Sequence, residues 1–382
     1  MNITHICLAG MVTEGWSYQE NMLIKYHMAN GHAVTMITSQ WIRSGKTIKK
    51  CVKTDYIGEY GAHYVRLPIT NKDAIDYRFK RYSGLLEAIE QSKPDLIFIH
   101  NFQFIDIKTV AKYLNDHPVP LLIDSHSDFS NSGSNFISRI FLHKCFWRHY
   151  AHLIEPYVTF FYGVLPARVD FLTDVYGLPK EKCRLLVMGV DDELARKAKA
   201  SSSRSVIRKK YGISENDFLI MTGGKIDKAK RQTLLLMQAV KKIKCNRLKL
   251  LIFGSVDSSF LEEFNSLCDG NIIQFAGWVD SANTYDYIDA ADLFVFPGRH
   301  SVYWEQVAGL GIPMIVKDWA GTHHVDLGGN VLFLKEDTVQ EIQFTIESIL
   351  FDSNKYSAMK RAAEKGIAIF SYDKISRRAI EI

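Results

Sequence analysis

The sequence predicts an α/β protein built from two doubly wound, Rossmann-like domains. Short apolar runs alternate with segments of helical periodicity, which is the pattern of parallel sheets covered on both faces. This alternation starts near the amino terminus and starts again near residue 216. A chain of 382 residues is also too long for one ordinary hydrophobic core and suits two domains.

The first half contains four predicted strands, "ITHICLAG", "HAVTMIT", "DLIFIH" and "PLLIDSH", with helical patterns over 17–30, 78–92 and 106–115. Ser17 and Glu20 have the spacing of a capping box, and Gly31 is expected to end the first helix. The loop "AGMVTEG" would then lie at the carboxyl end of the first strand, where doubly wound domains bind ligands.

The second half contains predicted strands in "DFLIMTGG", "LKLLIFG", "IIQFAGW", "LFVFPG" and "PMIV", alternating with helices over 231–243, 258–267, 283–290 and 303–310. We therefore expect a first domain over 1–190, a charged and serine-rich linker over 191–215, and a second domain over 216–367. The last segment, 368–382, is helical in pattern and is expected to pack back on the first domain.

The composition indicates a globular protein, with 47% apolar and 23% charged residues. A net charge of +5 suits anionic ligands and does not call for nucleic acid. The six cysteines show no zinc-ligand spacing, the amino terminus lacks the features of a signal peptide, and no apolar run is long enough to span a bilayer. We expect a cytoplasmic protein that could contact the inner face of a membrane only peripherally.

The stretch "TGGKIDKAKRQTLLL", residues 222–236, has the character of an anion site. Gly223 and Gly224 are predicted at a strand-to-helix turn, where glycine permits positive φ and close approach of a ligand. Lys225 and Lys230 add two positive charges, and Arg231 follows at the start of the helix. A solvated, lysine-rich loop is the alternative interpretation.

The second half resembles the glycosyltransferases of family 4, the group 1 glycosyl transferases. The likeness runs in order through "LLIFGS", "IIQFAGWVDSANTYDYIDAADLFVFPG", "EQVAGLGIPMIV" and "GGNVLF". It continues outside this half in "GWSYQENMLIKYHMANGHAVTMITSQ", "LLIDSH", "YGLPKEKCRLLVMGVDD" and "FSYDKISRRAIE", and so spans nearly the whole chain. The resemblance implies the GT-B fold, in which two Rossmann-like domains face a central cleft, and a nucleotide-sugar donor.

For the donor site, the resemblance implies that Lys225 and Lys230 contact the diphosphate. Further donor-binding candidates are Gly223, Gly224, Arg231, Gly254, Gly277, Trp278, His300, Ser301, Glu305 and Gln306. Gly277 and Trp278 match the region that receives the base, although Trp278 could equally be a core residue. His323 and His324 fall in a donor-side loop and suggest zinc only weakly.

One departure from the family concerns its two glutamates, which lie eight positions apart. The second glutamate, which contacts the ribose, corresponds to Gln306, with Glu305 adjacent. The loop "PGRHSVYW" is too short for the first, and His300 or Ser301 would occupy its neighbourhood. An amide can still bind a ribose hydroxyl, whereas the role of the first glutamate near the transferred sugar is in doubt.

In the first half, His126 ends a predicted strand, and the resemblance implies that it contacts the transferred sugar. A hydrogen-bonded structural histidine is the alternative, and Asp124 and Asp128 are weaker candidates. On the acceptor side, the loop and helix start supply Gly15, Gln19 and Glu20.

The expected function is retaining transfer of a sugar from a nucleoside-diphosphate sugar to a carbohydrate or lipid-linked saccharide. His126, Lys225 and Lys230 are the predicted catalytic residues, and no metal is expected, since the chain lacks an Asp-x-Asp pair. The alternatives are a nucleotide-sugar epimerase or hydrolase, and a non-catalytic subunit that binds a glycan or a partner. Residues 135–152 could dock on an anionic membrane, or could form a helix with one buried face.

Overall fold

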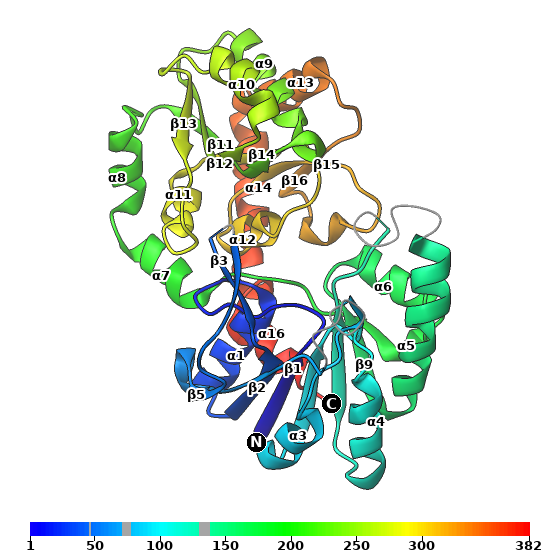
Figure 1. Ribbon diagram of the computed structural model, residues 1–382. Coiled ribbons are helices and arrows are strands. Elements are labelled where there is room, and N and C mark those ends of the chain that lie inside the picture. Colours follow the sequence, from blue (N-terminus) through cyan, green and yellow to red (C-terminus); the bar gives the residue numbers. More distant parts are fainter. Residues whose placement is uncertain (46, 71–77, 130–137) are drawn as a thin grey trace. The chain divides into compact units, whose positions relative to one another are not determined.

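The computed structural model describes residues 1–45, 47–70, 78–129 and 138–382, with backbone alone for 138–141. The chain folds into two compact units, one formed by Met1–Val187 with Ile375–Ile382 and the other by Met188–Lys374. Each unit contains a parallel sheet with helices packed against it (Figure 1). The prediction of two Rossmann-like α/β sheets is confirmed.

The first unit is built on an eight-stranded sheet with the order β10-β9-β8-β7-β1-β2-β6-β5. Its strands are β1 Asn2–Cys7, β2 Ala33–Ser39, β5 Asp55–Ile57, β6 His63–Leu67, β7 Leu96–His100, β8 Leu121–Ser125, β9 Val158–Gly163 and β10 Cys183–Leu185. Only β5 pairs antiparallel among these strands, and β3 (Trp41–Ser44) and β4 (Thr47–Lys50) form a separate hairpin.

The helices of this unit are α1 Gln19–Ala29, α3 Leu85–Ser92, α4 Ile107–Asp116, η2 Ser138–Trp147, α5 Arg148–Ile154 and α6 Pro166–Asp174, with short turns η1 Glu59–Gly61, η3 Glu155–Tyr157 and η4 Lys180–Lys182. The central strands are buried on both faces, which explains why they consist of nearly continuous apolar runs. Ile6, Ile97 and Ile123 lie in the hydrophobic core that these strands and helices share.

The second unit has a six-stranded parallel sheet with the order β13-β12-β11-β14-β15-β16. Its strands are β11 Phe218–Ile226, β12 Leu248–Val256, β13 Ile273–Gly277, β14 Leu293–Phe296, β15 Met314–Lys317 and β16 Val331–Leu334. Its helices are α7 Asp192–Ala200, α8 Ser203–Lys210, α9 Gln232–Lys242, α10 Leu261–Leu267, α11 Thr284–Ala290, α12 Tyr303–Gly309, α13 Val339–Leu350, α14 Ser353–Ala363 and α15 Gly366–Ile369, with short turns η5 Lys228–Lys230, η6 Ser258–Phe260 and η7 His323–Val325. The last helix, α16 Tyr372–Ala379, begins in this unit and ends in the first.

The two glycines of the anion motif lie within β11 and not at a turn after it. The strand continues to Ile226, because Gly224 still pairs with Gly254 of β12. A Cβ atom on Gly254 would lie 2.0 Å from the Gly224 carbonyl oxygen, and one on Gly223 would lie 2.2 Å from the Phe253 ring. Gly254 therefore has a packing reason, the close approach of its backbone to that of Gly224, and Gly223 has one in the Phe253 ring, in addition to any role towards a ligand.

The start of α1 differs from the predicted capping box. The helix begins at Gln19 with Tyr18 as its N-cap, and no side chain caps it. The N–H groups of Asn21 and Met22 both donate to the Tyr18 carbonyl, so Ser17 lies outside the first turn. The predicted helix end is confirmed, since Gly31 has φ +82° and its N–H donates to Met28 O.

The expected linker, 191–215, instead forms helices α7 and α8 of the second unit. Asp191 caps α7 by accepting from the N–H groups of Glu193 and Leu194. The Arg208 side chain is buried and donates to Asp292 and to backbone carbonyls. The sequence of this segment resembles a linker because its buried apolar residues are few, Ala195 and Ala198 in α7 and Ile207 in α8, and because one of its buried side chains is an arginine.

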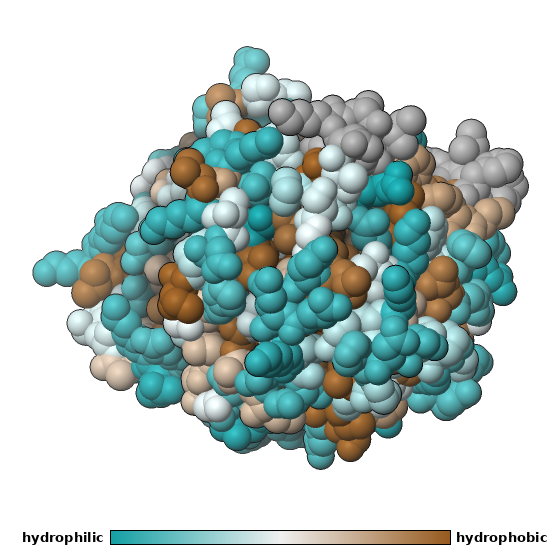
Figure 2. Space-filling model, turned by 60° about the horizontal axis from the view of Figure 1, so that its bottom comes forward, coloured by the Kyte–Doolittle hydropathy of each residue, from teal (hydrophilic) through white to brown (hydrophobic). Residues whose placement is uncertain are grey.

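No helix among the described residues combines the length and the apolar character needed to cross a bilayer. On the face shown in Figure 2, apolar residues form separate patches among polar ones. Part of the proposed membrane-docking segment 135–152, including residues 135–137 and the Arg139 side chain, lies outside the described residues. In the remainder, His143 and Trp147 are buried and Lys144 is exposed, as in a helix with one buried face.

We predict that Gly254→Ala destabilises the second unit by at least about 3 kcal/mol, because the new methyl group would collide with the Gly224 backbone and the residue has φ +123°. Thermal and urea unfolding followed by circular dichroism would measure this. Gly270→Ala is the matched control: its φ is also positive, but no atom lies within 4 Å of its Cβ position, so only about 1–2 kcal/mol is expected. Equal losses of stability in the two variants would show that the close approach of the Gly254 and Gly224 backbones is not the cause.

Candidate functional site

The first part of the candidate site lies at the carboxyl ends of β11 and β14 in the second unit. Lys230, on η5, holds its ammonium over the backbone of Gly224, where a Cβ atom would lie 3.3 Å from Nζ. The Tyr303 ring is 3.6 Å from the same point, and the Lys230 Cα is 3.3 Å from the Cβ position of Gly298. Because Gly224 and Gly298 have no side chains, a ligand can approach their backbone beside the Lys230 ammonium. This arrangement suits a phosphate.

Lys230 is a partly buried cation without a fixed counter-ion. Within the described residues its Nζ has no hydrogen-bond or ion-pair partner. Burial lowers the pKa of its ammonium, Asp227 acts in the opposite direction, and Arg299 lowers the pKa further. A bound anion would remove this electrostatic cost, so the site is prepared for a negatively charged group.

Lys225 differs from Lys230, although both belong to the predicted pair. Its side chain is 67% exposed, and Nζ lies 3.2 Å from Asp227 Oδ2. Asp227 also accepts from the Ala229 N–H at 3.0 Å and so fixes the start of η5. Arg231 is exposed at the start of α9. Lys230 is therefore held in place by the fold, whereas Lys225 and Arg231 are solvated cations at its margin.

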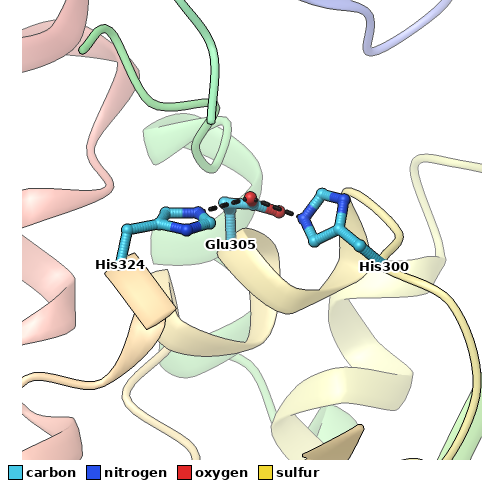
Figure 3. Close-up of side chains that lie close together, drawn as sticks. All are labelled: His300, Glu305 and His324. Carbon is cyan, nitrogen blue, oxygen red and sulfur yellow. Dashed lines mark hydrogen bonds and ion pairs between the residues drawn. The ribbon is translucent and has the colours of Figure 1, made fainter. Parts of the chain in front are cut away.

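A cluster of His300, Glu305 and His324 forms the second part of the site (Figure 3). His300 follows β14, Glu305 lies on α12 and His324 on η7. Both histidine Nε2 atoms lie 2.8 Å from the same carboxylate oxygen, Glu305 Oε1. Burial alone would raise the pKa of the Glu305 carboxyl, but His300 and His324 together lower it to about 2. The carboxylate is thus ionised and locked in position.

The cluster has the composition of a metal site, since its three ligand atoms lie within 4.8 Å of one another. Its hydrogen bonds argue against that use, because both Nε2 atoms must carry protons to donate to Oε1. A metal would need those nitrogens deprotonated and about 2.0–2.2 Å away from it. A ligating histidine also normally donates its other N–H, whereas His324 Nδ1 has no partner. The arrangement fits a hydrogen-bonded support better than a metal centre.

Gln306 and Ser301 flank this cluster. Gln306 is buried, and its Oε1 has no hydrogen-bond partner. Ser301 Oγ accepts from the Tyr303 N–H at 3.4 Å, near the start of α12. Of the two neighbouring candidates for the ribose, Glu305 is engaged by histidines and Gln306 offers an unused amide oxygen. The structure therefore favours the alignment that places Gln306 at the position of the second family glutamate.

Trp278 follows β13, beyond Gly277, which has φ +74°. The side chain is 73% exposed, so the alternative that it packs in the core is wrong. An exposed indole at the carboxyl end of a parallel strand offers a flat surface on which a base could stack.

In the first unit, His126 lies just beyond β8 with its side chain 35% exposed. Its Nε2 lies 3.5 Å from Oδ1 of Asp124, which is fully buried. Asp128 pairs with Arg168 at 3.1 Å and so has a structural role. His126 thus lies beside a carboxylate, just beyond the carboxyl end of strand β8.

The acceptor-side candidates are at the start of α1. Gly15 has φ +81°, and its N–H donates to Glu59 Oε2 at 2.6 Å. Gln19 is buried, and neither atom of its amide has a partner. Glu20 follows it in the first helical turn. Of these residues, Gln19 has the clearest unused capacity for hydrogen bonding.

Sequence reasoning missed Asp227, Arg299 and Tyr303. Asp227 fixes η5, Arg299 acts electrostatically on Lys230, and Tyr303 lies over Gly224. Asp227 had a signal, because an aspartate directly before a polar turn is a frequent cap. Arg299 and Tyr303 lie in the loop where the chain departs from the family pattern, so no motif pointed to them.

The chain is similar to known proteins both in a family sequence pattern and in fold. Residues 217–352 match the family described as "Glycosyl transferases group 1". A glycosyltransferase from Rickettsia africae ESF-5 is 14% identical, with a TM-score of 0.70 over 98% of this chain and 96% of that one. Anabaena Alr3699/HepE, in complex with UDP-glucose, is 15% identical, with a TM-score of 0.65 over 99% and 98%.

UDP-GlcNAc 2-epimerase from Neisseria meningitidis, bound to UDP-GlcNAc, is 12% identical, with a TM-score of 0.62 over 98% of this chain and 97% of that one. These solved structures establish the fold, while the class of protein comes from the family match. The chain is a glycosyltransferase with the GT-B fold, and the predicted resemblance is confirmed. The group 1 pattern lies in its second unit. No curated protein matches the sequence.

We predict that Glu305→Gln lowers stability at pH 7 by on the order of 3 kcal/mol, because a buried ionised acceptor for two histidines is lost. The folded pKa of about 2 lies below the ordinary value, so the carboxylate contributes fully above about pH 5 and its contribution is lost as the pH falls towards 2. The variant should therefore lose less stability than wild type over this window.

Urea unfolding at a series of pH values would measure both effects. Asp318→Asn is the matched control, because it removes a carboxylate that contacts an exposed histidine, His323, at 2.6 Å. We expect a change of less than about 1 kcal/mol for the control. A similar loss of stability in both variants would show that burial of Glu305 does not strengthen its contribution.

Proposed function

We propose that this glycosyltransferase moves a sugar, with retention of configuration, from a nucleoside-diphosphate sugar to a carbohydrate or lipid-linked saccharide. The observation that carries the proposal is the unpaired, partly buried ammonium of Lys230 above the Gly224 backbone. Such a cation is suited to a leaving group that gains negative charge as the glycosidic bond breaks. Anabaena Alr3699/HepE, which has the same fold, was solved with UDP-glucose.

In this mechanism Lys230 binds the diphosphate, and Lys225 adds a solvated charge beside it. The bond from the anomeric carbon to the β-phosphate oxygen breaks, and its electron pair goes to the phosphate. The acceptor hydroxyl forms the new bond on the same face and gives its proton to that phosphate oxygen. No protein base and no metal are required, because the two lysines stabilise the charge on the phosphate.

The other candidates take supporting roles. Gln306 offers its unpaired oxygen to a ribose hydroxyl, and Trp278 stacks on the base. His126 contacts the transferred sugar, and Gly15, Gln19 and Glu20 bind the acceptor. His300 and His324 act by holding Glu305, and therefore α12, in place.

A nucleotide-sugar epimerase or hydrolase is the second candidate function. It is favoured by the fold shared with UDP-GlcNAc 2-epimerase and by the absence of the first family glutamate from the short loop "PGRHSVYW". Release of free nucleoside diphosphate without sugar transfer would support it.

We also propose that the protein lies in the cytoplasm, because all six cysteines are free thiols. Any contact with a membrane would be peripheral.

We predict that Lys230→Met weakens nucleoside-diphosphate binding about 10- to 100-fold, because it removes the fixed cation. Lys225→Ala should cost less than about 5-fold, because its charge is solvated. Isothermal titration calorimetry with UDP, GDP and ADP, in the presence of EDTA, would measure both. Lys228→Ala, an exposed lysine of the same turn η5, is the control and should bind as wild type does.

Loss of binding in EDTA with recovery on adding a divalent ion would contradict the metal-free proposal. Equal losses for Lys228→Ala and Lys230→Met would show that general charge, and not a fixed cation, holds the diphosphate. If no nucleotide binds wild type, the proposed donor site is wrong.

A further prediction concerns Trp278. Trp278→Ala should weaken binding of the nucleotide about 5- to 50-fold, because base stacking is lost, while leaving inorganic pyrophosphate binding unchanged. Competition of the two ligands in the same titration separates the base from the diphosphate. Phe344→Ala, an exposed aromatic residue elsewhere on the second unit, is the control. Unchanged nucleotide affinity in Trp278→Ala would place the base elsewhere.

A further inference from the structure

A chain of buried polar side chains crosses the first unit. His27 Nε2 lies 3.0 Å from the Ser376 carbonyl oxygen, and His27 Nδ1 lies 3.0 Å from His5 Nε2. His5 Nδ1 is 2.9 Å from His100 Nε2, and His100 Nδ1 is 2.8 Å from Asp124 Oδ2. Four successive hydrogen bonds therefore join three imidazoles between a carbonyl and a carboxylate.

The sheet holds this chain in register. His5, His100 and Asp124 belong to β1, β7 and β8, which are neighbours in the sheet, and His27 lies on α1. His100 is the register partner of Asp124, and the rings of His5 and His100 stack at 5.1 Å with an angle of 14°. All three histidines and the aspartate are buried. Water therefore cannot replace a missing partner at low cost.

Counting protons gives the charge of the chain. Each of the four hydrogen bonds needs one proton, and neither end can supply one, since the Ser376 carbonyl and an ionised Asp124 only accept. Three neutral imidazoles carry three protons. A fourth is needed, so the three histidines together must hold one positive charge, which balances the negative charge of Asp124.

The charge belongs on the imidazole next to the carboxylate. Burial lowers the pKa of His5 well below its ordinary value and lowers that of His27 to about 4, so these two are neutral. Burial would raise the pKa of Asp124, but His100, followed by His126, holds it well below its usual range. His100 then donates from both ring nitrogens, while His5 and His27 are each protonated at Nε2.

Other titratable groups nearby do not supply the fourth proton of the chain. Burial raises the pKa of the Cys7 thiol, which remains neutral, with Glu20 and Lys80 acting on it at longer range. His32 lies beside His27, with ring centroids 6.0 Å apart, and is influenced by Arg377. Neither Cys7 nor His32 takes part in the four hydrogen bonds.

We propose that Asp124 is a positioning residue for His126, kept ionised by a chain of His100, His5 and His27 that carries one extra proton. Within the described part of the chain, the second oxygen of the carboxylate, Oδ1, has no hydrogen-bond partner, and it lies 3.5 Å from His126 Nε2. An ionised Asp124 therefore selects the form of His126 in which Nε2 is protonated and orients the ring at the end of β8. The inference about positioning depends on the proposed role of His126 in sugar transfer.

The protonation states can be measured without any substrate. Nitrogen-15 NMR of the histidine-labelled wild-type protein at pH 7, assigned through single variants, reports which ring nitrogens carry protons. We expect two protons on His100, Nε2–H on His5 and His27, and Nε2–H on His126. A His100 with a single ring proton, so that the three histidines hold three protons, would overturn the proposal.

Asp124→Asn tests the positioning. The Asn amide can donate to His100 Nδ1, so three neutral imidazoles satisfy the chain and His100 should lose its second proton. His126 loses the ionic contact, and its Nε2–H should exchange with solvent roughly 5-fold faster. His152→Gln is the control, since His152 contacts the Tyr176 carbonyl at 2.9 Å in the same unit and lies outside the chain. Identical His126 exchange in wild type and Asp124→Asn would overturn the positioning role.

A second pair of variants tests the chain at its other end. His27→Gln keeps a donor for Ser376 and an acceptor for His5, so His100 should stay doubly protonated. His27→Leu leaves the Ser376 carbonyl and His5 Nε2 buried without partners, and should lower the melting temperature markedly more than His27→Gln. Equal melting temperatures would contradict a continuous chain. The protonation states, the exchange rate and the melting temperatures are measured without nucleotide. Their interpretation therefore does not depend on whether the proposed donor site is correct.

Discussion

The close approach of β11 and β12 at Gly224 and Gly254 is the constraint on which the donor half of this protein depends. Because two backbones meet where side chains would collide, the carboxyl ends of these strands present open peptide groups. Lys230 can then reach over Gly224 with its charge unpaired. Tyr303, at the start of α12, lies beside the same stretch of backbone.

Both units place ionised carboxylates in their interiors and hold them with histidines. In the second unit one carboxylate oxygen accepts from two imidazoles, and in the first a carboxylate ends a line of three. Burying a charge of this kind costs free energy that hydrogen bonds to it offset, and those hydrogen bonds fix the position of the groups that make them. Rigid placement of α12 and of His126 follows from the same physical principle in two separate sites.

The sequence alone predicted the elements whose apolar residues recur at a regular spacing. Nine strands, including β1, β7, β11 and β12, were predicted because burial gives a continuous apolar run, whereas β6, β9 and β16 were not predicted. The helices α7 and α8 were missed because their buried apolar residues are few and because, in α8, a charged residue, Arg208, is buried through hydrogen bonds. The two histidine partners of Glu305 lie on separate segments, one after β14 and one on η7, so no local pattern could reveal that it is locked between histidines rather than turned towards a ribose. Trp278 was ambiguous because the indole side chain is common both in cores and on surfaces.

The return of Ile375–Ile382 to the first unit means that the second unit is, in topological terms, an insertion within the first. During synthesis, residues 188–374 emerge completely before the segment that finishes the earlier unit. When the whole of the second unit has been synthesised, the first unit therefore still lacks the Ser376 carbonyl that His27 requires. Synthesis of the first unit is thus completed after that of the second, even though its sheet is translated first.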